Sequence, residues 1–323
     1  MAPMAPDDPA RRRGVFRARI VANRPLCPDH YLLRMEAPGF PPSRPGQFVN
    51  LRCGPGGDLP GASPVDWPEG AFPPLDQDEL AGRRPLLRRP FSLAGRRDAP
   101  DGAARLEVLH RVVGVGTAWL AQQPAGAELD LMGPLGRGFE DVAARPRAAL
   151  VGGGTGIGPL LYLAEALAGA GVEAVAFAGA RTARLLPLTV ADDEPPSQAG
   201  WPTRCTAEFS ARGTPAVIAT DDGSLGRCGL VHEALARWMD DDGGDPSDLA
   251  VFACGPEAMM RAVAHLCRDR GCLCRLALER HMACGVGTCQ GCAVKVRADN
   301  DRGWAFKLAC RDGPVFDAQE LIW

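Results

Sequence analysis

The sequence predicts a mixed fold: an antiparallel β-barrel, then an α/β domain with a parallel sheet, then a small cysteine-rich C-terminal domain. In the first half, apolar and polar residues alternate in short runs between Pro/Gly turns, as in the strands of a barrel. In the second half, apolar runs alternate with stretches at helical spacing, which is typical of strand–helix repeats. From Glu279 onward about 45 residues remain, too few for a stable core without a staple.

The length of 323 residues favours two large domains and a small one. We expect the barrel at residues 1–145, the α/β domain at 146–280 and the C-terminal domain at 281–323. Residues 54–84 are rich in Gly, Pro and Asp and lack a sustained period, which predicts a long surface insertion in the barrel.

The individual elements follow from the same patterns. In the barrel we expect strands at residues 15–21, 47–51 and 106–110. In the α/β domain we expect strands at 148–151, 174–178, 216–219 and 249–253, and helices at 160–167, 230–239 and 258–267.

Composition and charge exclude several classes of protein. A content of 46% hydrophobic and 23% charged residues excludes disordered, collagen-like and coiled-coil chains. The net charge of −3 and the absence of basic runs longer than residues 11–13 argue against nucleic acid as a partner. No window approaches the roughly 18 apolar residues of a membrane span, and the N-terminus lacks an apolar signal segment, so we expect no membrane and a cytoplasmic address.

The twelve cysteines are therefore expected to be reduced, and a dense group of them indicates a metal site rather than disulfides. The C-x4-C-x2-C spacing with a distant fourth cysteine is the plant-type pattern of a [2Fe–2S] cluster. Its predicted ligands are Cys284, Cys289, Cys292 and Cys310. Glycines at 285, 287 and 291 would let the loop turn its backbone N–H groups toward the sulfur atoms. Zinc or free thiols remain the alternative.

Seven of the other eight cysteines are expected to be small buried hydrophobes: Cys27, Cys53, Cys205, Cys228, Cys267, Cys272 and Cys274. We expect Cys272 and Cys274 to point to opposite faces of a strand, so that they do not jointly hold an ion.

A glycine-rich turn follows the apolar run at 148–151 and opens a helix, the setting in which backbone N–H groups hold a dinucleotide pyrophosphate. The candidate residues are Gly152, Gly153, Gly154, Thr155, Gly156 and Gly158. The spacing departs from G-x-G-x-x-G, and no acidic residue ends the next strand, so a mere packing turn remains possible. Cys254, before Gly-Pro at another strand end, is a candidate contact of a nicotinamide.

Two segments of the barrel carry a further binding pattern. Arg89, Pro90, Phe91 and Ser92 combine a guanidinium that can pair with a phosphate and a hydroxyl that can reach a flavin ring edge. Leu109, His110 and Arg111 end a strand before Gly116 and Thr117, where glycines open a short helix and form a second phosphate cradle. Taken alone, the first segment means little, since an Arg and a Ser beside a proline are more often an ordinary strand entry.

Taken in order, these motifs resemble the ferredoxin-reductase family, which has an FAD barrel with R-x-[FY]-S and a nicotinamide domain with G-G-G-x-G and C-G-P. With the cysteine loop placed last, the chain is similar to the family of electron transfer subunits of class 1B dihydroorotate dehydrogenase. Residues 46–49, 132–139, 278–292 and 310–316 also match that family, so the resemblance spans about residues 15–320. The insertion after Cys53 departs from it.

The resemblance implies that the barrel segments bind FAD, the four C-terminal cysteines bind a [2Fe–2S] cluster, and the glycine turn with Cys254 serves NAD. Arg181 is able to accept a 2′-phosphate, so the preference for NAD over NADP rests on the resemblance. No catalytic residue is expected in this chain. The implied partner is an FMN-containing subunit that oxidises dihydroorotate in pyrimidine biosynthesis, in a heterotetramer with two copies of each chain. Electrons would then pass from FMN through the cluster and FAD to NAD⁺.

Two alternatives remain open. The chain could instead be the reductase subunit of a ferredoxin:NADP oxidoreductase or hydrogenase complex, with the same cofactors and a different partner. From another class, it could be a zinc-stapled binding module without enzymatic activity.

Overall fold

The computed structural model describes residues 13–54 and 88–323. Within these residues six strands close an antiparallel barrel in the order β1-β2-β5-β4-β3-β6. The strands are β1 (Gly14–Cys27), β2 (His30–Pro38), β3 (Phe48–Leu51), β4 (Arg89–Asp98), β5 (Ala103–Arg111) and β6 (Glu128–Leu135), and the short helix α2 (Val115–Ala121) follows β5. The predicted insertion lies, except for Gly54, outside the described residues.

A seven-stranded sheet forms the second part, in the order β10-β9-β8-β7-β11-β12-β15 over the described residues. Its parallel strands are β7 (Arg147–Gly153), β8 (Glu173–Ala180), β9 (Ala216–Thr220), β10 (Arg227–Cys228), β11 (Leu249–Cys254) and β12 (Leu273–Ala277). β15 (Val315–Asp317) joins β12 in antiparallel direction. The predicted fold class, a barrel followed by a parallel α/β sheet and a cysteine-rich end, is confirmed.

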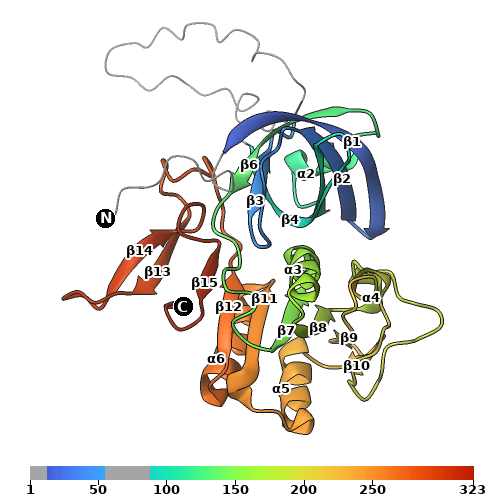
Figure 1. Ribbon diagram of the computed structural model, residues 1–323, viewed down its shortest axis with the longest axis vertical. Coiled ribbons are helices and arrows are strands. Elements are labelled where there is room, and N and C mark those ends of the chain that lie inside the picture. The colour runs from blue at the N-terminus through green and yellow to red at the C-terminus, as the bar shows by residue number, and fades with distance from the viewer. Residues whose placement is uncertain (1–12, 55–87) are drawn as a thin grey trace, which may run out of the picture.

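Helices cover both faces of the sheet, because side chains of its strands alternate between two cores. The longer helices are α3 (Ile157–Gly169), α5 (Val231–Asp242) and α6 (Glu257–Arg270), and α4 (Ala207–Ser210) is a single turn. Ala149 and Val151 face the core beneath α5 and α6, whereas Leu150 faces the core that contains α3. Figure 1 shows α3 lying between the sheet and the barrel. Among the described helices, none combines the length and apolar character that a membrane crossing needs.

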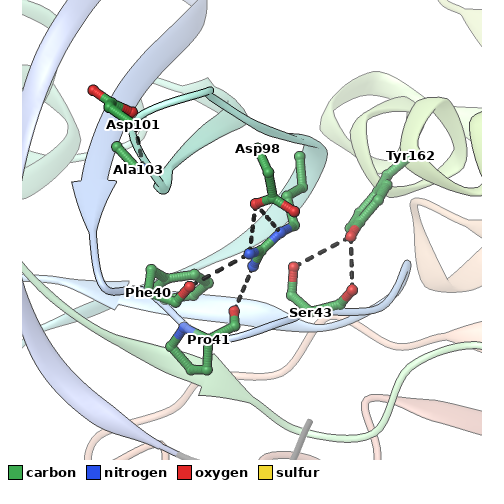
Figure 2. A network of polar contacts seen from close by, with 8 residues as sticks. Phe40, Pro41, Ser43, Asp98, Asp101, Ala103 and Tyr162 are labelled. Carbon is green, nitrogen blue, oxygen red and sulfur yellow. Dashed lines mark hydrogen bonds and ion pairs between the residues drawn. The ribbon is translucent and has the colours of Figure 1, made fainter. Parts of the chain in front are cut away.

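The barrel and the sheet are held together largely through α3. The Tyr162 hydroxyl on this helix donates a hydrogen bond to the Ser43 carbonyl oxygen at 2.8 Å and lies 3.2 Å from the Ser43 hydroxyl (Figure 2). The loop that carries Ser43 is fixed in turn by Arg96, which donates to the Pro41 carbonyl and pairs with Asp98 at 2.7 Å. These contacts hold the barrel against the edge of the sheet at which parallel strands end.

The C-terminal segment is not a separate core. It forms a two-stranded sheet of β13 (Ala293–Arg297) and β14 (Trp304–Leu308), and then returns as β15 to the large sheet. Cys292 and Cys310 lie in the same core as Val151 of the sheet and Phe48 of the barrel. The predicted boundary at residues 280 and 281 stays a prediction, but packing and strand pairing both cross it.

Two expectations about the remaining cysteines are wrong. Cys272 and Cys274 both lie in the core beneath α6 rather than on opposite faces, because residues two apart on a strand point the same way. Cys228 is exposed and Cys27 is half-buried, whereas the others of this group are buried as expected. Cys228 lies on β10, a two-residue strand at the edge of the sheet, where little packs against it.

Candidate functional site

A cavity of about 620 Å³, here called the barrel cavity, is lined by ten of the sixteen residues predicted to bind FAD or NAD. Residues of the barrel supply one side, and residues at the carboxyl edge of the sheet supply the other. The predicted residues that line it are Arg89, Pro90, Phe91, Ser92, Leu109, His110, Arg111, Thr117, Thr155 and Cys254. Motifs more than 160 positions apart in the chain thus face one space.

Strand pairing explains how the barrel motifs meet there. Arg89 to Ser92 begin β4 and pair with β3, so that Ser92 lies opposite Phe48, another residue of the cavity wall. The Thr117 hydroxyl accepts the backbone N–H of Val113 at 2.9 Å, which shapes the start of α2 at the cavity. Gly116 packs against Arg89: a Cβ there would lie 3.5 Å from two atoms of the Arg89 side chain.

His110 lies in the wall of the barrel cavity but faces protein. It is 1% exposed, and neither ring nitrogen has a hydrogen-bond partner among the described residues. Its ring stacks on Tyr31 at 5.4 Å and meets Phe91 edge-on at 6.0 Å. Burial, with a smaller contribution from His30, lowers the pKa of His110 to about 4. A neutral imidazole therefore supports Phe91 from behind.

At the sheet side, two titratable groups lie near each other. Cys254 ends β11 and is 3% exposed, and burial, followed by the nearby Glu279 carboxyl, raises the pKa of its thiol well above the ordinary value. Glu279 follows β12 and is open to the cavity, yet the surrounding protein desolvates it enough to raise the pKa of its carboxyl. Cys254 is therefore a neutral thiol, not a nucleophile.

Sequence reasoning missed part of this wall. The residues added by the structure are Phe48, Val113, Leu278, Glu279, Arg280, His281, Met282 and Pro314. For Leu278 to Met282 a signal was present: the segment follows the last parallel strand, and polar groups at the carboxyl ends of parallel strands gather at one edge.

A second cavity, of about 380 Å³ and here called the edge cavity, lies at the carboxyl ends of β7, β8 and β9. Gly153 and Gly154 line it, together with Arg181 and Asp221 from the neighbouring strand ends. Arg111 of the barrel lines both cavities, so the two spaces meet at this side chain.

The glycine turn divides into two roles. Gly154 has φ +56°, and no atom lies within 4 Å of where its Cβ would be, so it presents bare backbone to the edge cavity. Gly156 instead permits a close approach, because its Cβ would lie 2.2 Å from the Cys254 carbonyl oxygen. Gly152 and Gly158 likewise face packed side chains, those of Ile157 and Leu109. Only part of the predicted glycine set is therefore open to a ligand.

The cysteine loop carries its own hydrogen-bond donors. The Cys284 sulfur accepts the backbone N–H groups of Val286 and Cys289, each at 3.4 Å, and the Cys292 sulfur accepts the Cys310 N–H at 3.4 Å. The Cys289 N–H, ahead of the other donors, lowers the pKa of Cys284 to about 6. Gly285 at φ +72° and Gly287 at φ +90° supply the turns that aim these N–H groups inward.

The four thiols lie near one another. Cys284 interacts with Cys289 and with Cys310, and Cys310 interacts with Cys292. Across the described ranges, no three His, Cys, Asp or Glu side chains gather round a point suited to one metal ion. Four neighbouring thiols, with N–H donors to sulfur, fit a two-iron cluster held by four cysteines.

Comparisons with known proteins agree with this site. The family model of the iron-sulfur cluster binding domain of dihydroorotate dehydrogenase B matches residues 279–322. The electron transfer subunit of dihydroorotate dehydrogenase B (NAD(+)) from Desulforamulus reducens is 33% identical over 310 residues, 96% of this chain and 98% of the relative. The corresponding subunit from Caldanaerobacter subterraneus is 31% identical over 311 residues, 96% of this chain and all of the relative.

Solved structures agree in fold. A chain of an NADH-dependent reduced ferredoxin-NADP oxidoreductase, solved for insight into flavin-based electron bifurcation, superposes with a TM-score of 0.67 at 26% identity, covering 94% of this chain and 89% of that one. A ferredoxin NADP⁺ reductase from Neisseria gonorrhoeae, with bound FAD and NADP, superposes with a TM-score of 0.53 at 15% identity, covering 83% and 95%. The latter likeness concerns the fold alone.

Proposed function

The chain belongs to the family of electron transfer subunits of dihydroorotate dehydrogenase B, and from this premise we propose that it passes electrons from an FMN-containing catalytic subunit through a [2Fe–2S] cluster and FAD to NAD⁺ in pyrimidine biosynthesis. The catalytic subunit oxidises dihydroorotate, and the complex contains two copies of each chain. The chain itself is an oxidoreductase subunit.

One observation carries the proposal: the three predicted binding regions are adjacent and in a useful order. The edge cavity meets the barrel cavity at Arg111. On its other side, the barrel cavity is walled by Leu278 to Met282, and the first cysteine of the loop, Cys284, follows two residues later. Nucleotide, flavin and cluster would thus lie in sequence, as electron transfer between them requires.

We assign FAD to the barrel cavity. The Arg89 guanidinium is suited to the pyrophosphate, and the Ser92 hydroxyl to the edge of the flavin ring. The proposed contacts are Arg89, Pro90, Phe91, Ser92, Leu109, His110, Arg111, Gly116 and Thr117, with His110 acting through Phe91. Bound there, FAD supplies the conversion between single-electron transfer and two-electron hydride chemistry.

We assign NAD to the edge cavity. Gly153 and Gly154 offer backbone to the pyrophosphate, while Gly152, Gly156 and Gly158 let the turn pack closely and Thr155 and Cys254 face the flavin side. Arg181 is able to attract a 2′-phosphate, but the Asp221 carboxylate opens on the same cavity and would repel it. This opposing charge supports NAD rather than NADP.

We assign the cluster to Cys284, Cys289, Cys292 and Cys310, whose four thiolates would hold the two irons. The N–H groups directed at Cys284 lower the pKa of this thiol and so favour the thiolate, the form that binds iron.

The test is co-purification of this chain with the dihydroorotate-oxidising subunit of the same organism, followed by measurement of dihydroorotate-dependent NAD⁺ reduction. We expect activity in the complex and none with the catalytic subunit alone. A chain that carries FAD and cluster but does not associate would contradict the proposed partner.

The likeness to the NADH-dependent ferredoxin-NADP oxidoreductase supports a second candidate, a reductase subunit with another redox partner. Two electron donors would be compared for the reduction of ferredoxin by the purified chain. Reduction with NADPH as the donor, and none with dihydroorotate and the catalytic subunit, would favour this second candidate. A purified chain without visible absorption from flavin or iron–sulfur would contradict both electron-transfer functions. It would instead favour the zinc-stapled binding module.

A further inference from the structure

A polar side chain of the barrel reaches the cysteine loop. Asn50 lies in β3, is 1% exposed and is flanked on the strand by the buried Val49 and Leu51. Its Nδ2 donates a hydrogen bond to the Cys284 carbonyl oxygen at 3.3 Å. The barrel and the first cysteine of the loop are thus joined directly.

The loop is pressed closely against this amide. Gly285 has φ +72°, and a Cβ at that position would lie 2.1 Å from the Asn50 Nδ2. A side chain at position 285 would therefore displace the loop or the amide. Asn50 thus contacts both the Cys284 carbonyl and the turn at Gly285.

The same face of β3 also reaches the barrel cavity. Residues two apart on a strand share a face, and Phe48, two positions before Asn50, lines the cavity. Phe48 also packs in the core that contains Cys292 and Cys310. One short strand therefore lines the proposed flavin space, bonds to the backbone of Cys284 and contributes to the core that contains Cys292 and Cys310.

The amide is costly where it is. The Asn50 Oδ1 is buried and has no hydrogen-bond partner in the described part of the chain, and an unsatisfied buried acceptor destabilises a protein. A leucine of similar size would fill the position without that cost. What the asparagine provides and a leucine would not is the hydrogen bond to the Cys284 carbonyl oxygen.

We propose that Asn50 is a positioning residue, which fixes the Cys284 end of the cluster loop against the wall of the barrel cavity and so sets the rate of electron exchange between cluster and flavin. This inference rests on the proposed function. Each transfer oxidises one of the two groups by one electron and reduces the other by the same electron, and Asn50 exchanges neither electron nor proton. Its effect comes from holding the separation constant, because electron transfer slows steeply with distance.

The test uses the full chain loaded with FAD and cluster, and compares the wild type with Asn50→Leu. On rapid mixing with NADH, we expect flavin reduction at the wild-type rate and slower reduction of the cluster by at least severalfold. Challenge with an iron chelator, which needs no turnover, should strip the cluster about fivefold faster, equivalent to about 1 kcal/mol for one hydrogen bond.

Asn23→Leu is the matched control. The Asn23 Nδ2 also donates from a barrel strand to a backbone carbonyl, that of Leu120 at 2.8 Å, and its Oδ1 is also buried without a partner among the described residues. We expect the control to lower stability without changing the cluster phase or the chelator rate. If the leucine variant does not fold, Asn50→Asp replaces it, because aspartate keeps the shape and has an oxygen in place of the donor. As for Asn50→Leu, we expect slower reduction of the cluster and faster loss of the cluster to the chelator.

Wild-type rates in Asn50→Leu, or equal slowing of the flavin and cluster phases, would overturn the inference. Equal slowing would mean that Asn50 supports the fold in general. A wild-type chain that holds neither flavin nor cluster would instead be a failure of the proposed function, and is seen before any variant is made.

Discussion

Single buried polar groups mark the places where this barrel does more than fold. His110 and Asn50 are each 1% exposed, and each has polar atoms without partners among the described residues. Neither is a residue that a barrel core requires, since an aromatic or aliphatic side chain would pack there at less cost. His110 lies behind the proposed flavin site and Asn50 behind the cluster loop. The destabilising buried polar groups therefore lie next to the proposed binding sites.

The buried His110 makes stability depend on pH. Its folded pKa of about 4 is below the ordinary value of about 6.5, so between these values the unfolded chain binds a proton that the folded chain does not. Stability therefore falls as pH falls through this window, by up to roughly 3 kcal/mol below pH 4. His110→Phe, which keeps the stacking on Tyr31, should lose this dependence when denaturation midpoints are compared at pH 8 and pH 4. Gln at the exposed His265 should keep the wild-type profile, and an unchanged profile in His110→Phe would refute the assignment.

Glu279 has the opposite dependence. Desolvation by the surrounding protein raises the pKa of its carboxyl, although the side chain is open to the cavity. The folded chain therefore keeps a proton that the unfolded chain has released, and stability falls as pH rises from about 4.5 through the raised pKa. Glu279→Gln should raise the thermal midpoint of the FAD-loaded chain above that window, and leave it unchanged below about pH 4.5. Gln at the exposed Glu173 should give no such pH-dependent gain. A gain that persists at acid pH would show that charge is not its cause.

At this scale the sequence was an uneven guide. The four cysteines could be singled out because their spacing is typical of a cluster, and the R-P-F-S segment only together with the later motifs; their roles stay predictions. Asn50 and Glu279 were not, because a lone Asn or Glu beside apolar residues has no pattern until the topology brings distant segments to it.

At the scale of elements, strand ends and turns form the walls of the barrel cavity and the edge cavity. The turn after β7 passes so close to the end of β11 that only glycine fits at position 156. This approach places Thr155 and Cys254 in one cavity wall, although about 100 residues separate them in the chain. The glycine turn therefore serves packing as much as ligand binding, which its sequence pattern left open.

Gly156→Ala tests this packing role. Its backbone is in the ordinary right-handed region, so the added methyl causes no conformational strain, but it would lie 2.2 Å from the Cys254 carbonyl oxygen. We expect a loss of at least about 1–3 kcal/mol in stability and weaker NAD binding, measured by thermal unfolding and by titration. Gly169→Ala, at the exposed end of α3 with nothing within 4 Å, should be neutral or stabilising by up to about 1 kcal/mol. Equal effects of the two variants would contradict a specific contact at Gly156.

Element prediction succeeded where hydrophobic periodicity was long and failed where pairing is non-local. The expected helix at 160–167 lies inside α3, and the expected strand at 249–253 lies inside β11. The antiparallel addition of β15 was not predicted, since a three-residue strand has no periodicity and its register depends on β12, about 40 residues earlier.

For the whole molecule, the C-terminal segment is integrated with both larger parts. Leu278 donates its N–H to the Pro314 carbonyl, and Arg137, after the last barrel strand, donates its N–H to the Gly313 carbonyl at 2.5 Å. Asp317 of β15 pairs with Arg275 of β12. The segment that holds the cluster is therefore positioned by the sheet and the barrel at once, and the cluster should not be needed for either to fold.

Cys289→Ser tests this independence. Cys289 is the exposed thiol of the four, so its replacement removes a ligand without disturbing the core that contains Cys292 and Cys310. We expect loss of the iron–sulfur absorption with FAD content unchanged, because none of the barrel-cavity wall depends on Cys289. Reduction of FAD by NADH should persist, while dihydroorotate-dependent NAD⁺ reduction in the complex falls to the level of the catalytic subunit alone. Serine at the exposed Cys228, outside the loop, should change none of these measurements. Loss of FAD together with the cluster would mean that the bound cluster, and not the packing of the polypeptide, holds the wall from Leu278 to Met282 in place.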